Sequence, residues 1–113
     1  MGRLEPIQPR LGAAPRTRAV CAIMRIECRD GLDEEFEALL GDLAHLVRTD
    51  EPGCESYVVT RAMGSRAHFA VHARFANWLS FERHAETTHL RRLMPRLTAL
   101  MAAPMAMEIF LEA

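Results

Sequence analysis

The side chains best suited to proton transfer lie in one short segment of the sequence. His84 and His89 stand five residues apart, with Thr87 and Thr88 between them. Imidazole gains and loses a proton near physiological pH, so either ring could position a ligand or move a proton. Packing and capping around the two threonines is the alternative that the spacing leaves open. A metal site is not predicted, because this spacing differs from the i, i+4 histidine pair of a helical site and no cysteine or carboxylate is placed to complete it.

Other polar side chains have weaker signals. Tyr57 could donate a hydrogen bond to a ligand, and a buried tyrosine anchored by its hydroxyl is an equal alternative. His68 and His72 share one face of a predicted strand with Arg74, and this basic strip favours a dimer interface or a solvated surface over catalysis. The sequence has no glycine-rich phosphate loop and no arrangement typical of a serine or cysteine nucleophile.

The elements that must position these side chains follow from the apolar periodicity. Strands are expected over 18–28, 55–62, 67–75 and 105–112, and helices over 33–49, 77–86 and 89–102. A kink or restart is expected at Pro95, inside the last helix. The order β-α-β-β-α-α-β predicts an α+β fold, a ferredoxin-like two-layer sandwich with an antiparallel sheet.

The chain of 113 residues has the length of one domain. Residues 1–17 contain three prolines and no clear period, which predicts a flexible N-terminal arm before a domain over 18–113. The net charge of −1 gives no electrostatic argument for nucleic acid, and no apolar run reaches membrane-spanning length. Three irregularly spaced cysteines indicate free thiols in a reducing compartment, so a cytoplasmic protein is expected.

The first and last strands carry apolar residues on both faces. Helices can cover only one face of a single sheet, so a second copy of the same sheet is the simplest cover for the other. The pattern therefore predicts a homodimer formed through the helix-free sheet face.

Two segments resemble a known family. Glu51-Pro52-Gly53-Cys54-Glu55-Ser56-Tyr57 is similar to its "EPGCxxY" motif, and His84-Ala85-Glu86-Thr87-Thr88-His89 to its "HxxTxH" segment. Together they resemble the antibiotic biosynthesis monooxygenase domain over about residues 18–112. The resemblance implies a homodimer with sheets face to face, a dimeric α/β barrel. It also implies an oxygenase that uses no metal or flavin: an electron-rich, quinol- or anthrone-like molecule is deprotonated and its carbanion reduces dioxygen directly.

The sequence departs from the family at the end of the third strand. Where members often carry Glu-x-Trp, this chain has Ala73-Arg74-Phe75. The haem-degrading relatives need Asn, Trp and His where this chain has Arg25 or a neighbour, Phe75 and Leu93, so haem degradation is disfavoured. The alternative to a monooxygenase is a non-catalytic small-molecule-binding or stress-response protein of the same fold.

A ligand pocket is predicted between the helices and the sheet. His84 and Tyr57 are the expected catalytic residues. The expected substrate-binding residues share an aromatic or apolar character, His89 excepted: Phe69, Val71, Phe75, Trp78, Phe81 and His89. Solid packing of these aromatics without a cavity is the alternative.

Overall fold

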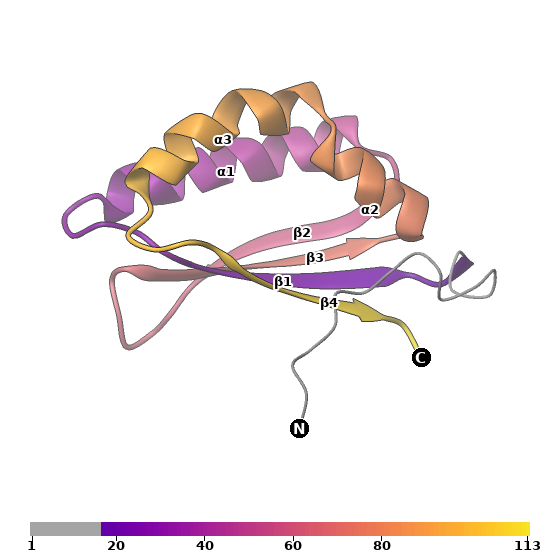
Figure 1. Cartoon of the computed structure of the whole chain (residues 1–113), viewed down its shortest axis with the longest axis horizontal. Coiled ribbons are helices and arrows are strands. Elements are labelled where there is room, and N and C mark those ends of the chain that lie inside the picture. Colours follow the sequence, from indigo (N-terminus) through magenta and orange to yellow (C-terminus); the bar gives the residue numbers. More distant parts are fainter. Residues whose placement is uncertain (1–16) are drawn as a thin grey trace.

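A four-stranded antiparallel sheet with helices on one face makes up the computed structural model, which describes residues 17–113 (Figure 1). The elements are, in chain order, β1 (Val20–Glu27), α1 (Asp33–Asp50), β2 (Cys54–Arg61), β3 (His68–Phe75), α2 (Trp78–Ala85), α3 (Thr88–Leu100) and β4 (Ala106–Leu111). The strands lie in the order β2-β3-β1-β4. The predicted ferredoxin-like two-layer sandwich is confirmed.

The core lies between the two layers because each central strand alternates its side chains across the sheet. On β1, Val20, Ala22, Met24 and Ile26 are buried under the helices, and the residues between them face the other way. Helix α1 presents an apolar stripe to this face: Phe36, Leu39, Leu40, Leu43, Ala44 and Val47 are buried. The helix-facing side chains of the sheet therefore form one wall of any site that lies between the two layers.

The short helices begin at side-chain caps. Asn77 Oδ1 accepts a hydrogen bond from the backbone amide of Ser80 and starts α2. Thr87 Oγ1 accepts one from the amide of Leu90 and starts α3. The chain therefore breaks between α2 and α3 at Thr87, which fixes the directions of both helices.

Helix α3 runs without interruption through Pro95, so the restart expected there is wrong. Proline removes the bond that would join its nitrogen to the carbonyl of Arg91, four residues earlier. Both residues are exposed, so water can satisfy that carbonyl and the helix continues.

The helix-free face of the sheet combines apolar and paired charged side chains. Val58 and Phe110 are half exposed there. Arg25 forms an ion pair with Glu108, and Arg74 lies between Glu55 and Glu112. These pairs leave few charges unbalanced on a surface that still exposes large apolar groups.

The predicted N-terminal arm, residues 1–17, lies outside the described residues except for its last one. Among residues 17–113, no helix has the length and apolar character needed to cross a membrane.

Candidate active site

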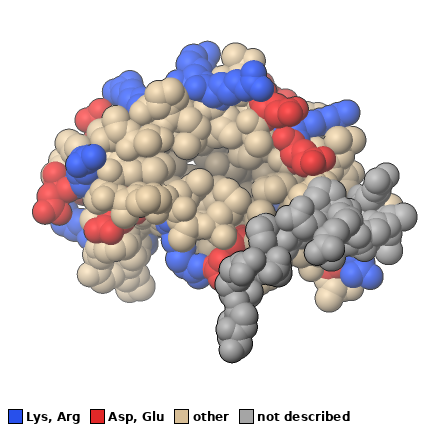
Figure 2. Space-filling view, viewed as in Figure 1, with Lys and Arg blue, Asp and Glu red and all other residues tan. Residues whose placement is uncertain are grey.

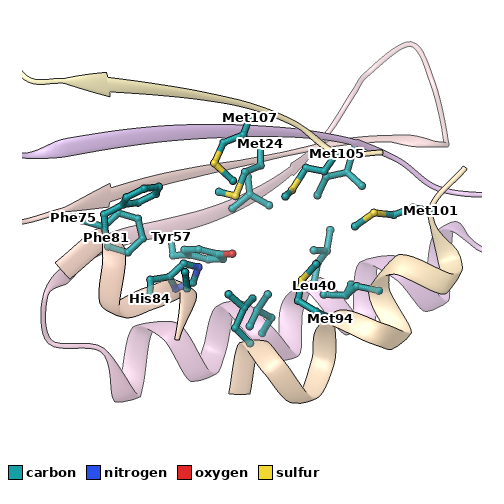
Figure 3. A pocket seen from close by; sticks show the side chains of 16 residues that line it. Met24, Leu40, Tyr57, Phe75, Phe81, His84, Met94, Met101, Met105 and Met107 are labelled. Atoms are coloured by element: carbon teal, nitrogen blue, oxygen red, sulfur yellow. The ribbon is translucent and has the colours of Figure 1, made fainter. Parts of the chain in front are cut away.

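A cavity of about 170 Å³ lies between the sheet and the helices. One side of its wall comes from the strands β1, β2, β3 and β4, and the other from the helices α1, α2 and α3 (Figure 3). Tyr57 and His84 are the two polar side chains of its wall, and the rest of the wall is apolar. An apolar cavity with a few convergent polar groups is the usual form of a small-molecule site.

The cavity has a mouth between the end of α2 and β4. Ala85 and Met107 line the cavity and are also exposed to solvent. Figure 2 shows the hollow between the helical layer and the sheet on this side of the molecule. The cavity is therefore open to solvent on this side of the molecule.

Methionines form much of the apolar wall. Five of the six methionines among residues 17–113 line the cavity: Met24, Met94, Met101, Met105 and Met107. Figure 3 places Met94, Met101 and Met105 at the end away from His84. Flexible, polarizable thioethers adapt to the shape of a bound ring, so this end suits an apolar group.

Tyr57 supplies the first polar group from β2. Its side chain is 3% exposed, and its hydroxyl points into the cavity (Figure 3). The hydroxyl has no hydrogen-bond partner among the described residues. Burial, with smaller effects from Cys54 and Glu51, raises the pKa of Tyr57 well above its ordinary value. Tyr57 is therefore a neutral phenol that can donate a hydrogen bond to a ligand oxygen.

His84 supplies the second polar group from the last turn of α2. Its ring packs 5.7 Å from the ring of Tyr57 and 5.2 Å from that of Phe75, between centroids. Its Nδ1 lies 2.9 and 3.0 Å from the two carboxylate oxygens of Glu51. A carboxylate only accepts hydrogen bonds, so Nδ1 carries the proton and donates it to Glu51. The lone pair of neutral His84 is then at Nε2, the other ring nitrogen.

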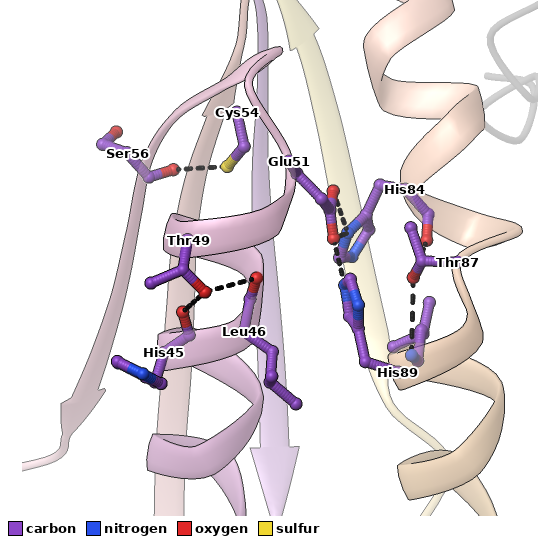
Figure 4. Close-up of polar contacts among 10 residues, drawn as sticks. His45, Leu46, Thr49, Glu51, Cys54, Ser56, His84, Thr87 and His89 are labelled. Atoms are coloured by element: carbon purple, nitrogen blue, oxygen red, sulfur yellow. Dashed lines mark hydrogen bonds and ion pairs between the residues drawn. The ribbon is translucent and has the colours of Figure 1, made fainter.

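Glu51 also binds His89, and the three side chains form a buried cluster (Figure 4). His89 Nε2 lies 2.5 Å from Glu51 Oε2. The side chains are each only 9–10% exposed. A buried carboxylate without partners would be strongly destabilising, and two imidazole donors satisfy it here. The cluster therefore fixes both the position and the proton of His84.

The turn before β2 brings Glu51 to α2. Glu51 caps the end of α1, and the backbone carbonyl of Gly53 accepts a hydrogen bond from the amide of Ala76, just before α2. A Cβ at Gly53 would lie 2.2 Å from Ser80 Oγ, so only glycine permits this close approach. The Glu-Pro-Gly-Cys turn and α2 thus form one packed unit.

The structure brings five of the eight expected site residues to the cavity wall: Tyr57, Val71, Phe75, Phe81 and His84. The other three expected residues, Phe69, Trp78 and His89, are not among the residues that line it. Phe69 lies at the other end of β3, where it packs edge-on against Phe36. Trp78 packs against Phe81 from outside the cavity, and His89 faces Glu51.

Sequence reasoning missed Glu51 as a site residue and treated its segment as a helix end. A signal was present, because negative charge at a helix C-terminus is disfavoured by the helix dipole. An acidic residue in that position needs a specific partner, here two imidazoles. Among residues 17–113, no three His, Cys, Asp or Glu side chains are grouped so that they could hold a metal ion.

One family of known proteins matches the sequence. The sequence profile described as antibiotic biosynthesis monooxygenase matches residues 19–96. No curated protein matches the chain.

Solved structures share the fold at low sequence identity. A Caulobacter crescentus protein assigned to the antibiotic biosynthesis monooxygenases is 21% identical and superposes with a TM-score of 0.83 over 88% of this chain and 94% of that one. PA3566 from Pseudomonas aeruginosa is 21% identical, with a TM-score of 0.78 over 87% and 97%. SnoaB, a cofactor-independent oxygenase from Streptomyces nogalater, is 18% identical, with a TM-score of 0.73 over 82% and 91%.

The fold and its cavity define an α+β sandwich with an apolar cavity between its two layers. The profile match covers more than half of the sequence, so the chain belongs to the antibiotic biosynthesis monooxygenase family.

Proposed function

We propose that this protein is a cofactor-independent monooxygenase that oxidises a small aromatic, quinol- or anthrone-like molecule, with His84 as its base and Tyr57 as its hydrogen-bond donor. The observation that carries the proposal is the pairing of His84 with buried Glu51 at the wall of an apolar cavity. This pairing leaves Nε2 as the proton acceptor. Family membership supports the reaction class.

His84 would start the reaction by accepting the proton of a substrate hydroxyl at Nε2, and Tyr57 would donate a hydrogen bond to a substrate oxygen. The electron-rich carbon then transfers electrons to dioxygen, and a carbon–oxygen bond forms to give a peroxide. Loss of the proton on that carbon breaks the oxygen–oxygen bond. One oxygen atom stays as a carbonyl, and the other takes both the proton held by His84 and the proton lost from that carbon, and leaves as water.

The apolar wall favours this chemistry in two ways. It excludes water, which strengthens the hydrogen bonds made by His84 and Tyr57 and protects a carbanion from protonation by solvent. Ala73 stands where the family often carries Glu, so the sheet gives no carboxylate here. We propose that Glu51, acting through His84 from the helical layer, is the carboxylate of this site.

We further propose a homodimer through the helix-free sheet face. The half-exposed Val58 and Phe110 support it, because large exposed apolar side chains on a surface whose charges are paired are typical of interfaces. A cytoplasmic location is supported by the three cysteines, all of which are free thiols.

Oxygen uptake with a panel of hydroquinones and anthrones tests the function. His84→Asn keeps an amide donor near the position of Nδ1 and removes Nε2, so uptake should fall at least about a hundredfold. The matched control is His45→Asn, which changes an exposed histidine of α1 and should leave uptake unchanged. Equal uptake by His84→Asn would refute the role of His84. Tight binding of the panel with no uptake by the wild type would favour the non-catalytic binding protein instead.

A further inference from the structure

We propose that the ligand of this cavity is a single-ring phenol with two neighbouring oxygens on one edge and a short apolar substituent on the opposite edge, a substituted catechol. The inference rests on the proposed function only in taking the ligand to be the oxidised molecule. It narrows the quinol- or anthrone-like class by the size of the cavity and by the position of its polar groups.

The size of the cavity limits the ligand to about one ring. An engineered apolar cavity of about 150 Å³ in another protein holds one benzene molecule. The cavity here, about 170 Å³, exceeds that by the volume of a small substituent. Anthrone has three fused rings and more than twice the ring carbons of benzene. Its outer rings would project through the mouth past Ala85 and Met107 and lose the burial that would stabilise them.

The polar groups of the wall are confined to one end. Tyr57 and His84 are adjacent, with ring centroids 5.7 Å apart. Tyr57 donates a hydrogen bond and neutral His84 accepts one, so together they match two neighbouring oxygens, one as acceptor and one as donor. Catechol carries its oxygens in this arrangement.

The opposite end cannot satisfy a polar group. Figure 3 places Met94, Met101 and Met105 there. A 1,4-hydroquinone holds its oxygens on opposite edges of the ring. When one oxygen meets His84, the other must lie among the thioethers without a good partner, and a buried unsatisfied hydroxyl weakens binding. An alkyl group at that edge fills the same space favourably.

Isothermal titration calorimetry without oxygen tests the inference with two isomers, 4-propylcatechol and 2-propylhydroquinone, and with anthrone. The isomers have the same atoms and nearly the same apolar area, so only the placement of oxygen differs. We expect 4-propylcatechol to bind at least about tenfold more tightly than 2-propylhydroquinone. Anthrone should bind more weakly than 4-propylcatechol.

Tyr57→Phe removes a single hydroxyl and should reduce the preference between the isomers to less than half of its wild-type ratio. The matched control is Met63→Ala, because Met63 is fully exposed in the loop between β2 and β3; this variant should keep the ratio. Equal affinity for the isomers, tighter binding of anthrone, or no binding of 4-propylcatechol would each overturn the inference.

The outcome is separable from that of the proposed function. Preferential binding of 4-propylcatechol without oxygen uptake would refute the oxygenase and leave the ligand class standing. Oxygen uptake together with tighter binding of anthrone than of 4-propylcatechol would support the oxygenase and refute the ligand class.

Discussion

Replacing Glu51 by glutamine removes one charge from the buried cluster and keeps its shape. The carboxylate accepts hydrogen bonds from His84 and His89, and hydrogen bonds to charged groups contribute about 1.5–3 kcal/mol each. The amide of glutamine has one oxygen, which can accept a hydrogen bond from one of the two imidazoles. Its NH2 group then faces the imidazole of the other histidine. We therefore expect Glu51→Gln to lower the free energy of unfolding by about 3 kcal/mol, or the melting temperature by roughly 10 °C.

The same substitution should lower activity through the proton of His84. An amide N–H facing Nδ1 favours the tautomer in which Nδ1 is the acceptor and Nε2 carries the proton. His84 could then no longer accept a proton from a ligand, so oxygen uptake should fall by at least about a hundredfold. Nitrogen-15 NMR of the imidazole at neutral pH would report the change of tautomer directly.

Thermal unfolding followed by circular dichroism is the assay for stability, with Asp50→Asn as control. Asp50 precedes Glu51 in the chain and is exposed, so its loss of charge should change the free energy of unfolding by less than about 0.5 kcal/mol. If Glu51→Gln had the same melting temperature as the wild type, the charge of the cluster would contribute no stability. If His84 also kept its tautomer, the reasoning from Glu51 to catalysis would be wrong.

Two further predictions concern one buried side chain, Tyr57, and one exposed side chain, Val58. Tyr57 is the only tyrosine, and its raised pKa means that folding stabilises the neutral phenol: this contribution is complete below the ordinary tyrosine pKa of 10.0 and is lost as pH rises above it. An absorbance titration should show no tyrosinate in the folded protein near pH 10, and ionisation there without unfolding would contradict the burial argument. Val58→Asp should weaken the proposed dimer in sedimentation experiments, whereas Leu79→Asp, an equally exposed residue on α2, should not; a monomeric wild type at micromolar concentration would refute the dimer.

Periodicity was sufficient to predict the order of the elements and most of their ends. Alternating apolar residues identify β1 and β3, and the stripe from Phe36 to Val47 identifies α1. Asn77 was also predictable as a cap from its residue type and position. The continuation of α3 through Pro95 was not, because it depends on whether the lost bond faces water.

The site was predictable only in part, because a strand pattern gives a side chain's face and not its depth along the sheet. Phe69 and Phe75 share a face of β3, yet only Phe75 reaches the cavity, since Phe36 of α1 covers the other end. The contact between Glu51 and His84 joins residues 33 positions apart and depends on the packing of α2 against the turn before β2. No local pattern contains that information.

The break at Thr87 has a consequence for how the chain can vary. In a continuous helix, five residues advance about 140° beyond a full turn, so His84 and His89 would point to different sides. Because α2 ends and α3 restarts between them, both rings converge on Glu51. Inserting or deleting one residue in this break would rotate His89 away while leaving each helix intact. The length of the two-residue linkage, Glu86 and Thr87, is therefore constrained by the need to bring both imidazoles to Glu51, although these residues lie outside both helices.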